Sequence, residues 1–169
     1  LGSLWGYYKA GYEFGILGVK LSERFSHPAQ KCKTLCALAG DLTPWVTHIK
    51  STQGVANEAY QAGLYAGEFL FAGFALMHKI MHWFYEGINL KQILTDIPKF
   101  LKFCQKTKNQ AATDVMIGYH LAIHNLCGLT SEKHAFHTDS MDEAQFLKDC
   151  QTHHSAIALC TYQILKSQV

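Results

Sequence analysis

A short motif occurs twice along the chain and constrains the fold more than any other feature. The first copy is Gly11–Ile16 and the second is Ala59–Leu64, and both follow the pattern small–Tyr–polar–x–Gly–aliphatic. Each copy lies in a long stretch without β-strand alternation and is followed by a second apolar stretch. Units of this kind cannot bury their apolar face alone, so they stack on their neighbours. The motif therefore predicts helical hairpins, which usually bind or regulate and seldom catalyse.

Apolar spacing extends the helical prediction along the whole chain. We expect about seven helices, at residues 4–25, 28–39, 55–66, 69–85, 90–107, 111–126 and 141–166. Glycine, proline and short polar side chains separate them, as they do at helix ends. No βαβ pattern and no glycine-rich phosphate loop occurs. The sequence predicts one all-α domain over residues 1–169, built of antiparallel helical hairpins.

Several short segments are expected to shape these helices. Residues 40–44 interrupt the second helix as a kink or a short break, and residues 45–49 continue helically. Pro98 kinks the fifth helix or marks its start. Ser140 caps the last helix, and Glu143 three residues later completes a capping box.

The composition excludes several classes of function. The chain is 49% hydrophobic and 17% charged, which is typical of a folded domain with a substantial core. The formal net charge is +2 and no dense Lys/Arg block occurs, so we expect no nucleic-acid partner. The most apolar stretch, residues 69–83, is interrupted by His78, Lys79 and His82. We therefore expect a buried helix there and no membrane span.

Six cysteines occur, and none forms a C-x-x-C pair. They lie within helical patterns, so we expect free thiols in a reducing compartment, the cytoplasm. The chain begins with Leu1, which leads us to expect a fragment of a larger protein.

Two histidine pairs carry the sharpest chemical signal. His78 and His82 are four residues apart, as are His120 and His124, so each pair shares a helix face. On facing helices the four imidazoles would suit zinc, iron or copper. No carboxylate completes either motif, and ten histidines make this spacing easy to obtain by chance. We expect neither metal nor cofactor, and the alternative is a metal-binding helical bundle with oxidoreductase or hydrolase activity.

Large amphipathic side chains on the fourth and sixth helices are the candidates for binding. We expect His82, Trp83, Tyr119 and His120 to be exposed in the groove between adjacent hairpins, because such side chains dominate interface energetics. The carboxylates are thinly spread, and no acid/base pair or activated nucleophile can be assembled from them. We therefore expect no catalytic residue and no enzyme activity in this chain.

A set of spaced residues resembles one known protein context. The set comprises Trp45-x2-His48-Ile49, Glu58–Leu64-x2-Gly67-Glu68, Phe71–Ala75-x2-His78-x3-His82-x-Phe84-x2-Gly87-x2-Leu90 and Tyr119-x5-Asn125-Leu126-x-Gly128. It looks like the tetratricopeptide-like helical region of large bacterial multi-sensor signalling kinases. Those proteins join a serine/threonine-kinase-like domain, an AAA-type ATPase, a GAF sensor and a histidine kinase. Val55 stands where such proteins usually have a proline, and the sequence after Leu129 diverges.

The resemblance implies hairpins that stack as a short tetratricopeptide-like superhelix. It also implies a module for protein–protein interaction or intramolecular regulation in a cytoplasmic bacterial signalling protein, with kinase, ATPase or sensor domains as partners in cis or in trans. The family's kinase and ATPase motifs are absent from this chain. Besides the metal-binding bundle, a second alternative is a small-molecule sensor with its ligand between the fourth and sixth helices.

Overall fold

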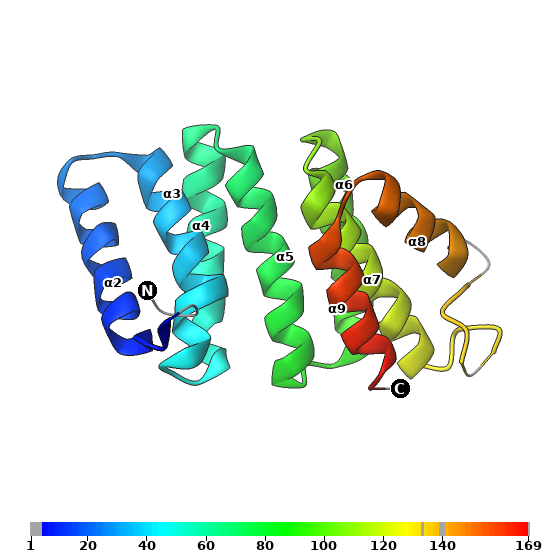
Figure 1. Cartoon of the computed structure of the whole chain (residues 1–169). Coiled ribbons are helices and arrows are strands. Elements are labelled where there is room, and N and C mark those ends of the chain that lie inside the picture. Colours follow the sequence, from blue (N-terminus) through cyan, green and yellow to red (C-terminus); the bar gives the residue numbers. More distant parts are fainter. Residues whose placement is uncertain (1–4, 133, 139–140, 169) are drawn as a thin grey trace. The chain divides into compact units, whose positions relative to one another are not determined.

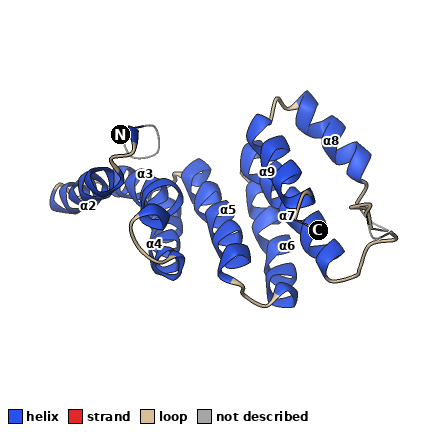
Figure 2. Cartoon of the chain, turned by 60° about the horizontal axis from the view of Figure 1, so that its bottom comes forward, coloured by secondary structure: helices blue, strands red, loops and turns tan. Residues whose placement is uncertain are grey.

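The computed structural model describes residues 5–132, 134–138 and 141–168 (Figure 1). This part of the chain is all-α, as predicted, with eight α-helices joined by turns and short 3-10 and π segments. The only β-type pairings among the described residues are two isolated bridges in one loop (Figure 2). None of the helices described combines the length and the hydropathy that crossing a membrane requires.

The chain divides into two compact units, residues 1–86 and 87–169. The sequence predicts that the whole chain forms one helical-repeat domain and stacks as a tetratricopeptide-like superhelix. Both statements stay predictions.

The first unit contains four helices that follow one another antiparallel, each in contact with the next (Figure 1). They are α2 (Tyr8–Arg24), α3 (Pro28–Ala37), α4 (Thr52–Ala66) and α5 (Phe69–Glu86). Pro28 begins α3, where its missing N–H costs nothing. Gly67 ends α4 in the left-handed conformation, which glycine adopts without strain. The predicted helix boundaries at residues 26–28 and 67–68 are confirmed.

The segment between α3 and α4 differs from the prediction. A π-helical turn at Leu38–Leu42 and a 3-10 turn at Thr43–Trp45 follow α3, and a second 3-10 turn spans Ile49–Ser51. The break at residues 40–44 is confirmed, but the continuous helix at residues 45–49 is wrong. His48 is extended there, and its Nδ1 accepts a hydrogen bond from the Lys50 N–H, which starts the next turn.

Both copies of the repeated motif lie at close contacts between helical segments. The side chains of Leu38 and Leu42 fill the space beside Gly15, and Ala72 and Cys32 fill the space beside Gly63. Because glycine has no Cβ, the neighbouring segment approaches more closely than a larger residue at the same position would allow. Both glycines therefore lie where another helical segment approaches closely.

The second unit is built around α7. It contains α6 (Leu90–Lys106), α7 (Gln110–Leu126), α8 (Glu143–Thr152) and α9 (Ala156–Lys166), and α7 contacts the other three. Asn89 caps α6 by accepting a hydrogen bond from the Lys91 N–H, so the helix begins there. Pro98 lies inside α6 and does not mark its start.

The single helix predicted at residues 141–166 is wrong. Two helices, α8 and α9, are separated by a turn in which His154 has a φ of +55°. Ser140 lies outside the described residues, and the residue that caps α8 is Asp142, whose side chain accepts from the Gln145 N–H. The carboxylate of Glu143 accepts hydrogen bonds from the Phe136 N–H and from two side chains of α9, Tyr162 and Lys166.

Glu143 therefore ties the loop before α8 to α9. Burial acts to raise its pKa, but the hydrogen bonds from Lys166 and Tyr162 outweigh burial and lower it. The carboxylate is charged at neutral pH and pairs with the Lys166 ammonium.

Gly63→Leu is expected to destabilise the first unit. A Cβ at this position would lie 2.8 Å from Ala72 Cβ and 2.9 Å from Cys32 Sγ, so a larger side chain forces α3 and α5 away from α4. We expect the free energy of unfolding to fall by about 1–3 kcal/mol. Urea denaturation of the variant and of the wild type measures the difference.

Gly54→Leu is the matched control, because it makes the same substitution in the same helix. A Cβ at Gly54 meets nothing within 4 Å. Leucine is the better helix former, so the stability should stay constant or rise by up to about 1 kcal/mol. An unchanged midpoint for Gly63→Leu would contradict the close contact at Gly63.

Candidate interaction surface

Helix α2 carries an apolar row that the rest of its unit leaves exposed. Phe14, Leu17 and Leu21 follow one another at spacings of three and four residues, which places them on one side of the helix. Tyr7 and Phe25 extend this side at its two ends. The exposed fraction of the five side chains runs from 42% at Leu21 to 71% at Phe25. We name these five residues the α2 face. Contiguous apolar surface of this kind is typical of an interaction site.

The α2 face is exposed because the helix contacts its own unit through small residues. A Cβ at Gly15 would come 2.6 Å from Leu38 Cδ2, and a Cβ at Gly18 would come 3.1 Å from Thr34 Cγ2. Ser22 is also buried on this side. The small side of the helix faces α3 and the π-helical turn, so the large apolar side chains lie beside this contact and stay 42% to 71% exposed.

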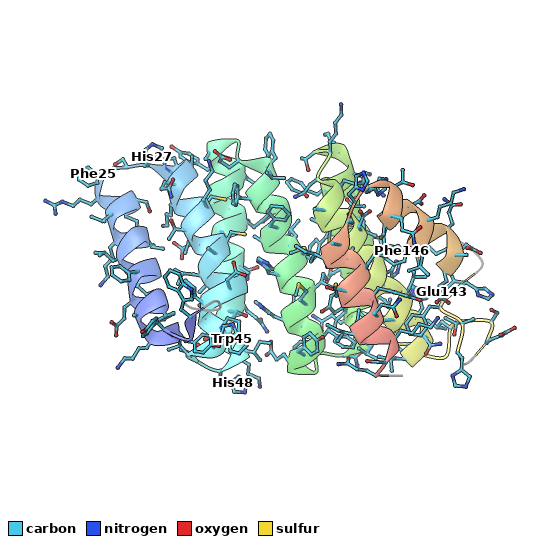
Figure 3. The ribbon with its side chains drawn as sticks, viewed as in Figure 1. Phe25, His27, Trp45, His48, Glu143 and Phe146 are labelled. Atoms are coloured by element: carbon cyan, nitrogen blue, oxygen red, sulfur yellow. The ribbon has the colours of Figure 1, made fainter. Side chains whose placement is uncertain are left out.

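A shallow groove runs between α2 and α3 beside the α2 face. Its volume is about 500 Å³, and its lining includes Leu21 and Phe25 from the α2 face and Gln30 and Thr34 from α3. Figure 3 shows Phe25 where α2 ends and His27 on the short connection to α3. The groove widens the apolar surface that a partner can contact.

Charged residues border the α2 face along one edge. Glu13 and Lys20 are exposed, and neither forms an ion pair within the part of the chain that the structure describes. Lys31 of α3, in contrast, donates to Glu23 at 2.7 Å and to Glu58 at 2.6 Å. These two carboxylates raise the pKa of Lys31. Glu23 therefore serves the contact between α2 and α3, whereas Glu13 and Lys20 face outward.

The two candidate residues on α5 are buried. His82 is 5% exposed, and its Nδ1 lies 2.7 Å from the hydroxyl oxygen of Thr52, the first residue of α4. Trp83 is 8% exposed, with the Lys79 ammonium 4.6 Å from a ring centroid. The prediction that both are exposed is wrong. The buried residues of α5 all lie between Ala72 and Trp83, whereas Phe69, Leu70 and Tyr85 near the ends of the helix are exposed.

His78, the partner of His82 in the first histidine pair, faces a thiol. Its Nδ1 lies 3.9 Å from Cys36 Sγ, and its ring occupies the space where a Cβ of residue 40 would lie, which only glycine leaves open. A cavity of about 250 Å³ adjoins them and is also lined by Asp41 and Phe71. Burial lowers the pKa of His78 to about 4 and raises that of Cys36 to about 12. Both groups are neutral at pH 7, so the thiol is not a nucleophile.

The second histidine pair lies on α7, in the other unit. His124 Nδ1 donates a hydrogen bond of 2.9 Å to the carbonyl oxygen of His120. His120 is half-buried, and its pKa is lowered to about 4 by burial and by His124. Tyr119 is 1% exposed, so the prediction that it is exposed is wrong. Whether His82, Trp83, Tyr119 or His120 binds a partner stays a prediction.

Among the described residues, no three or more His, Cys, Asp or Glu side chains are grouped so as to hold one metal ion. All six cysteines are free thiols, as predicted.

Asp114, which the sequence analysis does not single out, is a buried carboxylate of the second unit that accepts hydrogen bonds from three side chains. It is 2% exposed and accepts hydrogen bonds from Gln110 at 2.7 Å, from His153 at 3.2 Å and from the Ser155 hydroxyl. A cavity of about 350 Å³ between α7 and α8 lies beside it, with Phe146 in its lining. These hydrogen bonds hold the turn between α8 and α9 against α7, which explains why one long helix does not form.

Comparison with protein-family models, with curated proteins and with solved structures gives no match.

The sequence contained one signal for the α2 face. Gly11, Gly15 and Gly18 share one side of the helix, and that spacing predicts close contact with another helix on that side. It follows that the large apolar residues on the remaining sides face elsewhere. Asp114 had a weaker signal, as a lone carboxylate in an otherwise apolar helical stretch.

His82→Asn is expected to reduce the loss of stability in acid. Burial, with a contribution from His78, lowers the pKa of His82 to about 4 in the folded state, against about 6.5 in the unfolded state. The unfolded chain therefore binds the proton first, and the stabilising contribution is present above pH 6.5 and is lost as the pH falls towards 4. Asparagine does not titrate and keeps an amide near Thr52.

Urea denaturation at pH 8 and pH 5 measures this effect. The wild type should lose about 1–2 kcal/mol more than the variant between the two pH values. If the wild type and the variant lose the same stability between pH 8 and pH 5, His82 has the same pKa in the folded and the unfolded chain, which would contradict its burial.

Proposed function

We propose that this chain is a non-catalytic protein–protein interaction module of a cytoplasmic bacterial signalling kinase or ATPase, and that it binds through the α2 face. The observation that carries the proposal is the α2 face, whose five apolar side chains are each at least 42% exposed. Transferring apolar surface from water to a partner contributes roughly 25 cal/mol per Å². A complementary helix or groove therefore gains substantial free energy on this surface.

The geometry of α2 favours a helical partner. The apolar row follows the axis of α2, which is 17 residues long. The small residues of α2 lie on its side toward α3, so they are not available to a partner. Helices pair when such a row fits between the side chains of a second helix. Helical arrays extend by this kind of contact, because each added element covers the apolar side of the one before.

The ionisable groups within the two units support a role without catalysis. Burial raises the pKa of Cys32 and Cys150 to about 11 and that of Cys104 to about 12. These thiols are protonated at neutral pH and are poor nucleophiles. The hydrogen bonds to Asp114 come from its own unit and hold a turn, which is a structural use of a carboxylate.

The class of partner comes from the resemblance described at the outset. Repeated motifs and spaced aromatic and histidine residues resemble the helical region of multi-sensor kinases, where such a module would link a nucleotide-hydrolysing domain to an output domain. On this proposal the α2 face contacts a helical surface of a kinase, ATPase or sensor domain, in cis or in trans.

A photo-cross-linker placed at position 14 tests the proposal. Phe14 is replaced by p-benzoylphenylalanine, a larger aromatic residue that the exposed site accommodates, in the protein as cells produce it. We expect irradiation to join position 14 to a protein that carries a kinase, ATPase or sensor domain, as identified by mass spectrometry. Leu17→Lys in the same chain should reduce the yield at least tenfold, because a charge then faces the apolar contact.

Tyr65 supplies the matched control position, since it is aromatic and 85% exposed but lies on α4. Equal cross-linking at positions 14 and 65, or an unchanged yield in the Leu17→Lys chain, would refute the α2 face as the binding surface. Turnover of an ester, a phosphoester or a nucleotide by the purified chain would refute the non-catalytic assignment.

A further inference from the structure

The charges beside the α2 face are arranged so that a second copy of α2 complements them. Glu13 and Lys20 are seven residues apart, which is about two helical turns, so they project from the same edge of the face. In a two-fold symmetric, antiparallel helix pair, each edge of one helix lies beside the same edge of the other. The residue numbers of two residues that face each other across this pair always add up to the same value. A two-fold axis between Ile16 and Leu17 therefore places Glu13 opposite the partner's Lys20 and Lys20 opposite the partner's Glu13.

The same register matches the apolar side chains. Phe14 enters the space between the partner's Leu17 and the partner's Leu21. Tyr7, at one end of the face, meets the partner's Phe25 at the other end, and each of these contacts occurs twice by symmetry. A parallel pair would instead bring the charged edge against the edge that carries Tyr7 and Phe25, which would leave both charges without a counter-ion.

The two ends of this register, which are equivalent by symmetry, contribute no net attraction. Lys9 comes opposite both the partner's Glu23 and the partner's Arg24, of which one attracts and the other repels. Glu23 is also held by Lys31 within its own chain. The specificity of the pairing therefore rests on Glu13 and Lys20.

We propose that the partner of the α2 face in trans is a second copy of this chain, paired antiparallel through α2 about a two-fold axis between Ile16 and Leu17. This proposal rests on the function proposed above and names the partner of the same surface. One helix pair buries less area than a standard interface, so the dimer is weak and forms in the micromolar range. A weak dimer of this kind suits a signalling module that associates and separates.

Charge reversal with compensation tests the pairing. The association constant is measured by sedimentation equilibrium over a concentration series for the wild type, Glu13→Lys, Lys20→Glu and the double variant. Each single reversal creates two like-charge contacts in the dimer and should weaken association about tenfold or more. The double variant restores two opposite-charge pairs and should return to within about threefold of the wild type. Lys102→Glu, an exposed reversal on α6, is the control and should leave association unchanged.

The three residues that these variants change, Glu13, Lys20 and Lys102, are exposed, and circular dichroism checks that each variant is folded. Monomeric wild type at every concentration would overturn the proposal. So would association that does not respond to the single reversals, or a double variant that stays as weak as the singles. If the chain is monomeric while cross-links from position 14 reach another signalling protein, the second-copy proposal fails and the interaction function stands. If those cross-links are absent as well, both fail.

Discussion

Helix α2 contacts its own unit where only small side chains fit. Gly15 and Gly18 lie directly against Leu38 and Thr34, so the helix approaches α3 and the π-helical turn closely. A helix has one side toward its neighbour, and once that side is taken by glycines the large apolar residues must lie elsewhere. The exposed α2 face follows from this constraint. The proposed binding function, the proposed partner and the proposed two-fold pairing all depend on it.

The second unit relies on two hydrogen-bonded carboxylates, of which Asp114 is buried and Glu143 is partly buried. Asp114 of α7 accepts hydrogen bonds from both sides of the turn between α8 and α9, and Glu143 of α8 reaches two side chains of α9 and the backbone of the preceding loop. A carboxylate that leaves water without gaining hydrogen bonds lowers the stability of the fold, so both side chains need donors. The positions of α8 and α9 are set by these donors as much as by apolar packing.

Periodicity and glycine or proline spacing were sufficient to predict the all-α fold and most helix boundaries. Local patterns could not show that His153 and Ser155 turn towards Asp114, which lies about forty residues earlier in the chain. This contact interrupts the helix that the apolar spacing predicts at residues 141–166. Nor could they show that His48 is extended before α4. The exposure of Trp83 and Tyr119 was predicted wrongly because aromatic side chains look alike in sequence whether they fill a core or line a groove. The α2 face was missed for the opposite reason, since its residues look like core.

The central claim is that protein covers the α2 face when the chain functions. Hydroxyl-radical footprinting compares the labelling of Phe14, Leu17 and Leu21 in living cells with their labelling in dilute purified protein. Tyr65, which is exposed on α4, normalises the dose in each sample. The account predicts that labelling of the three α2 side chains falls several-fold in cells relative to Tyr65. Equal relative labelling in the two samples would contradict it.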